Sequence, residues 1–193
     1  MRIVPIGFAV CIALGTAACG TTPATSSSHA HAQASASAPV VEHDAVANMA
    51  PASGSLVSGR LQVMTMGANA LHIAGDIGGL EPGSSHGFHI HEHGDCSAAD
   101  ATSAGGHFNP TGSAHGRMDD GPHHGGDIDN IVANAQGVAR VNVHIPGLTL
   151  GSGAANDVAG RAIIVHADPD DYASQPSGNA GKRVACGVIT LAD

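Results

Sequence analysis

The stretch "GRLQVMTMGANALHIAGDIGGL", residues 59–80, contains two runs in which apolar and polar residues alternate, one on each side of "GANA". Alternation with a period of two places the apolar side chains of a strand on one face. A short break containing glycine between two such runs is typical of a β-hairpin. The stretch therefore predicts two antiparallel strands that share one buried face.

Three later segments have the same strand-like character. They are "GVARVNVHIPGL" (137–148), "GRAIIVHA" (160–167) and "RVACGVITLA" (183–192). No stretch of ten residues shows sustained helical periodicity. Aromatic residues make up only 2% of the chain and glycine occurs 27 times, so we expect a core of Val, Ile, Leu and Ala in short strands. The pattern predicts one all-β domain, a sandwich or barrel, over residues 45–193.

Two long segments, residues 92–130 and 167–183, read as loops. Loops of this length inside a compact domain are usually functional or disordered. Both are rich in histidine and aspartate, which favours a functional role. The formal net charge of −9, with only seven Lys and Arg residues, argues against a nucleic-acid partner.

The first 44 residues differ in composition from the rest of the chain. Residues 1–19 predict an export signal, because Arg2 precedes an apolar run that ends in small residues before Cys19. "GTAACG" resembles a bacterial lipoprotein signal, although Thr16 stands where an aliphatic residue is usual. We expect Cys19 to be lipidated and this anchor to be the one contact with a membrane. Residues 20–44, rich in Ser, Ala, Thr and Pro, predict a disordered tether.

The cysteines outside the predicted signal are Cys96 and Cys186. In an exported protein two such cysteines are expected to form a disulfide, with two free thiols as the alternative. Closing a loop of about 90 residues would stabilise the fold by about 4 kcal/mol on the chain-entropy account.

Histidines are concentrated in a few short motifs. In "GFHIHEHGDC" (87–96), His89 and His91 are two residues apart, so on a strand they project from the same face. Further ligand-type residues are His107 in "GGHFNP", His115 in "SAHGR", His124 and Asp127 in "HHGGD", and His166 in "IIVHAD". Imidazole suits zinc and copper, and this many ligands exceeds the need of one ion. The motifs therefore predict two metal ions.

Five motifs occur in an order and at a spacing that resemble the copper,zinc superoxide dismutase family. They are "GFHIHEHGDC", "SAGGHFNP", "HGGDIDNI", "GRAIIVHADPDD" and "GNAGKRVACGVI", within residues 45–191. The resemblance implies a Greek-key β-sandwich or flattened barrel of about eight antiparallel strands. It also implies copper and zinc as cofactors and superoxide as the substrate.

Residue roles follow from matching these motifs to the family. The resemblance places copper on His89, His91, His107 and His166. It places zinc on His107, His115, His124 and Asp127, so that His107 is shared. His124 is preferred to His123 because the family has its aspartate three residues after the ligand histidine.

Other residues receive supporting roles from the same resemblance. Asp170 would hydrogen-bond His89 and His115, and Arg183 would act with His107 in catalysis. Lys182 and Arg183 would steer the anionic substrate. His86, His93 and His144 have no ligand role in the pattern and are expected to be surface or structural residues.

Two alternatives from other functional classes compete with an enzyme. One is a carrier or store that binds copper or zinc without turnover, and the other is a structural protein of the cell envelope. The expected location is the bacterial envelope or periplasm, and the sequence leaves the oligomeric state open.

Overall fold

The protein is described by a computed structural model of residues 42–192. The predicted export signal, Cys19 and residues 20–41 of the predicted tether lie outside the described residues. The first strand begins at Asp44, one residue before the predicted start of the domain. Within residues 42–192 there is no helix with the length and apolarity needed to cross a membrane.

Residues 42–192 form eight strands and one short 3-10 helix. The elements in chain order are β1 (Asp44–Pro51), β2 (Ser58–Thr65), β3 (Ala70–Gly78), β4 (Ser85–His91), η1 (Thr102–Ala104), β5 (Asp127–Val132), β6 (Ala139–Pro146), β7 (Ala162–His166) and β8 (Arg183–Leu191). The all-β prediction is confirmed.

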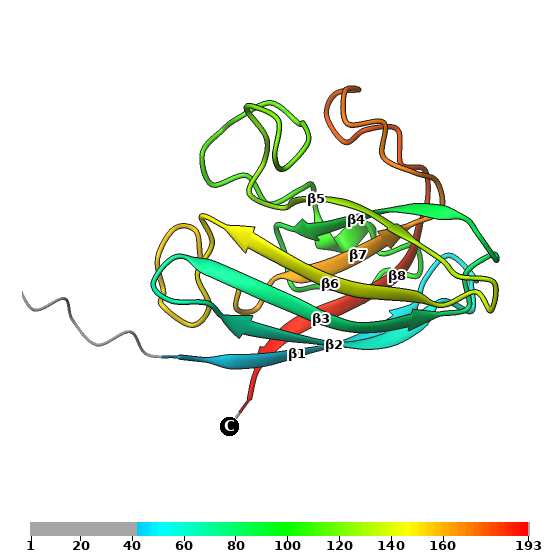
Figure 1. The fold of residues 1–193 in the computed structure, drawn as a ribbon, viewed down its shortest axis with the longest axis horizontal. Coiled ribbons are helices and arrows are strands. Elements are labelled where there is room, and N and C mark those ends of the chain that lie inside the picture. The colour runs from blue at the N-terminus through cyan, green and yellow to red at the C-terminus, as the bar shows by residue number, and fades with distance from the viewer. Residues whose placement is uncertain (1–41, 193) are drawn as a thin grey trace, which may run out of the picture. The chain divides into compact units, whose positions relative to one another are not determined.

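The strands form one antiparallel sheet in the order β5-β4-β7-β8-β1-β2-β3-β6. Strand β6 pairs with β3, and β7 pairs with β4, so the chain crosses between the two halves of the sheet in Greek-key fashion. The outer strands β5 and β6 are joined by a short hairpin in which Ala133 bridges Ala139. The sheet therefore curls into a nearly closed, flattened barrel (Figure 1).

The alternation in the sequence places the core inside this barrel. In the predicted hairpin, Leu61 and Val63 of β2 and Leu71 and Ile73 of β3 are fully buried. Their neighbours along the strands face outward, as expected for a strand with one buried face. The hairpin predicted for residues 59–80 is thus β2 and β3.

Strand β5 begins at Asp127 and so overlaps the end of the region predicted to be a loop, residues 92–130, which makes the end of that prediction wrong. Ile128 and Ile131 are both buried although they are three residues apart. The register against β4 shifts there, with Ile131 opposite His86 and Ile128 opposite Phe88. This irregularity places one extra residue in β5, so β5 lacks the simple alternation by which a strand is predicted.

Strands β4 and β7 are buried on both faces. Phe88 and Ile90 of β4 point into the barrel core, whereas His89 and His91 occupy the opposite face. Two long loops, residues 92–126 and 167–182, rise on the same side of the barrel, next to β4, β5 and β7 (Figure 1). The histidines of β4 are therefore enclosed between the sheet and these loops.

Candidate metal centre

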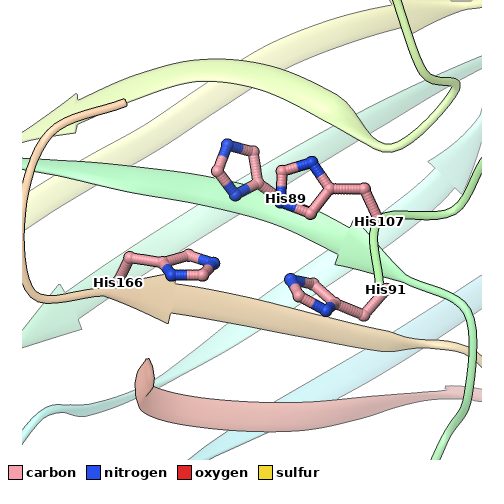
Figure 2. A group of neighbouring side chains, drawn as sticks. All are labelled: His89, His91, His107 and His166. Carbon is pink, nitrogen blue, oxygen red and sulfur yellow. The ribbon is translucent and has the colours of Figure 1, made fainter. Parts of the chain in front are cut away.

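Four buried histidines from separate parts of the chain meet outside the barrel wall. This first group is His89, His91, His107 and His166. One ligand nitrogen of each ring lies within 4.8 Å of those of the others. Figure 2 shows the rings arranged around a common centre, two from β4, one from the following loop and one from the end of β7.

The first group has the properties of a metal site rather than of a hydrogen-bonded cluster. Each of its four rings has one buried nitrogen without a hydrogen-bond partner in the described structure: His89 Nδ1, His91 Nε2, His107 Nε2 and His166 Nε2. A buried polar atom without a partner is costly, and a cation would satisfy all four. The donor set therefore fits a transition-metal ion that prefers imidazole.

The other nitrogen of each ring is held by an oxygen atom. His91 Nδ1 donates to the Gly105 carbonyl at 3.0 Å, and His166 Nδ1 donates to the Gly181 carbonyl at 3.3 Å. His89 Nε2 donates to Asp170 Oδ2 at 2.8 Å. Such contacts fix the orientation and tautomer of a metal-binding ring.

Backbone pairing brings His107 to the end of β4. Phe108 N donates to the Ile90 carbonyl at 2.8 Å, and Gly126 N donates to the Phe108 carbonyl at 2.8 Å. A Cβ on Gly126 would collide with the Ile90 carbonyl, so this close approach requires glycine. The loop thus continues the sheet for a few residues and sets His107 beside His91.

A second group adjoins the first and includes His107 again. Its members are His107, His115, His124 and Asp127. Asp127 Oδ1 lies 2.7 Å from His107 Nδ1, 3.0 Å from His115 Nδ1 and 3.2 Å from His124 Nδ1. The neighbouring His123 instead donates to the Gly121 carbonyl from a more exposed position. One oxygen and three nitrogens thus converge, a set that suits zinc.

Asp170 connects the two groups. Its Oδ2 accepts a hydrogen bond from His89 Nε2, and its Oδ1 accepts one from His115 Nε2 at 3.0 Å. The side chain of Asn130 on β5 holds the backbone of Asp170 on both sides, with its Oδ1 accepting from Asp170 N at 2.8 Å and its Nδ2 donating to Asp170 O at 2.9 Å. Asn130 is a positioning residue that the sequence analysis missed.

Burial disfavours the protonated form of His89, His91 and His166 in the first group. Burial lowers the pKa of His89 and of His91 well below the ordinary value, and His107 lowers both further. Burial also lowers the pKa of His166 to about 4. Neutral imidazoles have the lone pairs that metal binding requires.

The carboxyl group of Asp127 is ionised. Burial alone would raise its pKa, but hydrogen bonds from the His107 ring and from the Gly116 and His124 N–H groups outweigh burial and hold the pKa far below the usual range. The ionised carboxylate places a negative charge within the second group. That charge favours a divalent cation there.

Arg183 lies next to the first group at the start of β8. Its Nη1 donates to the Ala101 carbonyl at 2.7 Å and its Nη2 to the Gly105 carbonyl at 2.6 Å. A cavity of about 580 Å³ has His91, His107, His166 and Arg183 among its lining residues. A small ligand in this cavity can therefore meet both the histidines and a fixed cation.

The predicted disulfide between Cys96 and Cys186 is confirmed, with the two Cα atoms 5.8 Å apart. It ties the loop after β4, whose carbonyls accept hydrogen bonds from the Arg183 side chain, to the middle of β8. Lys182 is exposed and adjoins Arg183 along a surface hollow that also contains Asp100.

His86 and His93 do not belong to either group, as expected. His86 is buried and its Nδ1 donates to the His166 carbonyl at 2.8 Å, a structural role. His93 is exposed.

Gln175 holds the backbone of His115, with Oε1 accepting from its N–H and Nε2 donating to its carbonyl, both at 2.9 Å. No spacing in the sequence indicated the contacts of Gln175 or Asn130.

The fold and the site together define an eight-stranded β-barrel protein with two adjoining histidine-rich groups that could hold metal ions. The profile of the family described as copper/zinc superoxide dismutase (SODC) matches residues 57–189. The chain belongs to this family.

Individual relatives agree with the family match. The chain is 47% identical over 114 residues to superoxide dismutase (Cu-Zn) 2 of Aquifex aeolicus (strain VF5), covering 58% of this chain and 67% of that protein. It is 43% identical over 141 residues to superoxide dismutase (Cu-Zn) 2 of Mesembryanthemum crystallinum, covering 70% of this chain and 88% of that protein. The crystal structure of the clock protein EA4 superposes with a TM-score of 0.69 at 34% identity, covering 77% of this chain and 94% of that one.

Proposed function

We propose that the protein is an exported superoxide dismutase, which converts two superoxide anions and two protons to dioxygen and hydrogen peroxide. The observation that carries the proposal is the first group, in which four buried rings each direct one unpartnered nitrogen to a common centre. The membership of the family and the named relatives support the same activity.

Copper would be held by His89, His91, His107 and His166, and zinc by His107, His115, His124 and Asp127. When bound, copper supplies reversible one-electron chemistry between its cupric and cuprous states. His107 would be shared, with Nε2 toward the first group and Nδ1 toward the second. Its Nε2 is also the atom at which the chain can hold a proton beside the substrate when that nitrogen is free.

Arg183 would bind and orient the substrate. Its two terminal nitrogens each donate one hydrogen bond to a loop carbonyl, which leaves one further N–H on each for an anion. The two carbonyls hold the guanidinium in place beside the cavity, so little ordering is required when superoxide enters. Lys182 would add to the attraction of superoxide from solution.

Export and anchoring belong to the same proposal. The Arg2-led apolar segment of residues 1–19 supports export to the bacterial envelope, and Cys19 would carry the lipid. Mass spectrometry of the mature amino terminus tests this. A lipidated Cys19 supports anchoring, and an unmodified terminus beyond residue 19 would exclude it.

The function is tested by measuring bound copper and zinc in the purified protein and its rate of superoxide loss. We expect about one copper and one zinc per chain, with activity that a copper chelator abolishes and added copper restores. Copper at this level without superoxide loss would instead identify a carrier or store.

A further inference from the structure

A separate pair of histidines, outside both groups described above, lies on the outer face of β3 and β6. His72 on β3 is paired in register with His144 on β6. The residues next to them, Leu71, Ile73 and Ile145, are buried in the barrel core. Because side chains alternate along a strand, His72 and His144 point together away from the core.

The two rings are as close as rings that converge on one metal ion. Their centroids are 4.5 Å apart, with an angle of 41° between the ring planes. Within the first group, the centroid separations run from 4.0 Å for His89 and His107 to 6.4 Å for His89 and His91. The separation of His72 and His144 lies inside this range, so the two rings are close enough to approach one common ion.

Asn142 orients His72 in the way that a metal-binding ring is usually oriented. Its Oδ1 lies 2.6 Å from His72 Nε2, so this nitrogen donates and Nδ1 keeps its lone pair. Asn142 stands opposite Ala74, whose small side chain leaves room for the diagonal contact with His72. The contact matches that of His91, whose Nδ1 donates to the Gly105 carbonyl while Nε2 stays free.

We propose that His72 and His144 form a surface binding site for a divalent transition-metal ion, with copper bound more tightly than zinc. Two imidazoles suit both ions, and copper stands above zinc in the general order of affinity for nitrogen ligands. Among residues 42–192, no third His, Cys, Asp or Glu side chain completes a ligand group around this pair. The remaining positions on the ion are therefore open to water, which makes the ion exchangeable.

Two charged side chains further along β3 and β6 do not block the site. Asp76 and Arg140 are paired with each other further along the same two strands, with Asp76 Oδ1 3.3 Å from Arg140 Nε. Their charges largely cancel and both side chains are exposed. A cation can therefore approach the histidine pair without strong repulsion.

The test is a titration of the full copper- and zinc-loaded protein with Cu²⁺, after loosely held metal has been removed. Copper per chain is followed by equilibrium dialysis, and copper bound to imidazole nitrogen is followed by electron paramagnetic resonance. We expect one additional copper whose affinity falls at least about ten-fold in His72→Ala and in His144→Ala. The double variant should lose little more than either single variant, because one ring alone cannot chelate.

His43→Ala is the matched control, since the His43 ring packs against Gly151 rather than in the pair. It should bind the additional copper like the wild type. The His72 and His144 variants should keep the dismutase rate of the wild type, which shows that the fold is intact. Unchanged copper affinity in both variants, or no additional copper in the wild type, would overturn the proposal.

Discussion

His91 and Arg183 donate hydrogen bonds to the same atom, the carbonyl oxygen of Gly105. The distances are 3.0 Å from His91 Nδ1 and 2.6 Å from Arg183 Nη2. Gly105 belongs to the loop that Cys96 ties to β8 through the disulfide with Cys186. A ring of the first group, the arginine beside it and the disulfide loop are therefore positioned together.

The first prediction concerns how this loop holds Arg183. Arg183→Lys keeps a cation but cannot donate to both Ala101 and Gly105 in the same planar geometry. We expect Arg183→Ala to lower the rate of superoxide loss by about ten-fold or more, and Arg183→Lys to fall between it and the wild type. Rates are compared at equal copper content. Equal rates in all three proteins would show that the arginine has no part in the reaction.

A second prediction separates attraction of the substrate from chemistry. Lys182 and Asp100 border the same surface hollow beside Arg183 with opposite charges. We expect Lys182→Glu to slow the reaction most at low ionic strength, and Asp100→Asn to speed it under the same conditions. Rate is measured against salt concentration. A loss in Lys182→Glu that is the same at every salt concentration would argue against steering.

A third prediction concerns the carboxylate that joins the two groups. Asn at position 170 offers one acceptor oxygen, so either His89 or His115 loses its hydrogen bond in Asp170→Asn. Loss of such a contact should weaken metal binding by about 10- to 100-fold. Retention of copper and zinc is measured against a competing chelator.

The adjacent Asp171→Asn is the control for Asp170→Asn, because it makes the same charge change on an exposed side chain that contacts Ser174 and Asn179. It should retain both metals. Equal metal loss in the two variants would mean that the effect comes from charge alone and not from orientation of the rings.

A fourth prediction concerns the pH dependence of stability in the metal-free protein. The pKa of His166 is about 4 in the folded protein and near 6.5 in the unfolded chain. Above pH 6.5 neither state binds this proton. As the pH falls below 6.5, the unfolded state binds it first, so stability falls until about pH 4.

The expected loss from His166 alone is on the order of 3 kcal/mol by pH 4, and the lowered pKa values of His89 and His91 act in the same direction. Urea unfolding of metal-free protein at several pH values measures it. A free energy of unfolding that stays constant or rises from pH 7 to pH 5 would contradict the prediction.

Regular alternation is what made much of the fold predictable. The runs that became β2 and β3 alternate cleanly, with Leu61, Val63, Leu71 and Ile73 all buried. Strand β5 escaped prediction because the register shift against β4 places Ile128 and Ile131 on one side at a spacing of three. The spacing of apolar residues within one strand cannot reveal a register shift, because the shift depends on the neighbouring strand.

The candidate ligands follow from short motifs, but the contacts that orient them do not. Asn130 reaches Asp170 only because β5 lies beside the loop after β7, and Gln175 reaches His115 across two loops. These pairs are separated by 40 and 60 residues, and each involves at least one loop residue. Their geometry depends on the folded loops and has no periodic pattern in the sequence.

We propose that the imidazole of His107 belongs to two metal centres. Anomalous diffraction from crystals of the loaded protein, recorded at the copper and zinc absorption edges, tests it most directly. We predict a copper peak among His89, His91, His107 and His166, and a separate zinc peak among His107, His115, His124 and Asp127, each within bonding distance of one His107 nitrogen. A single peak, or two peaks of which one lies away from His107, would contradict the account.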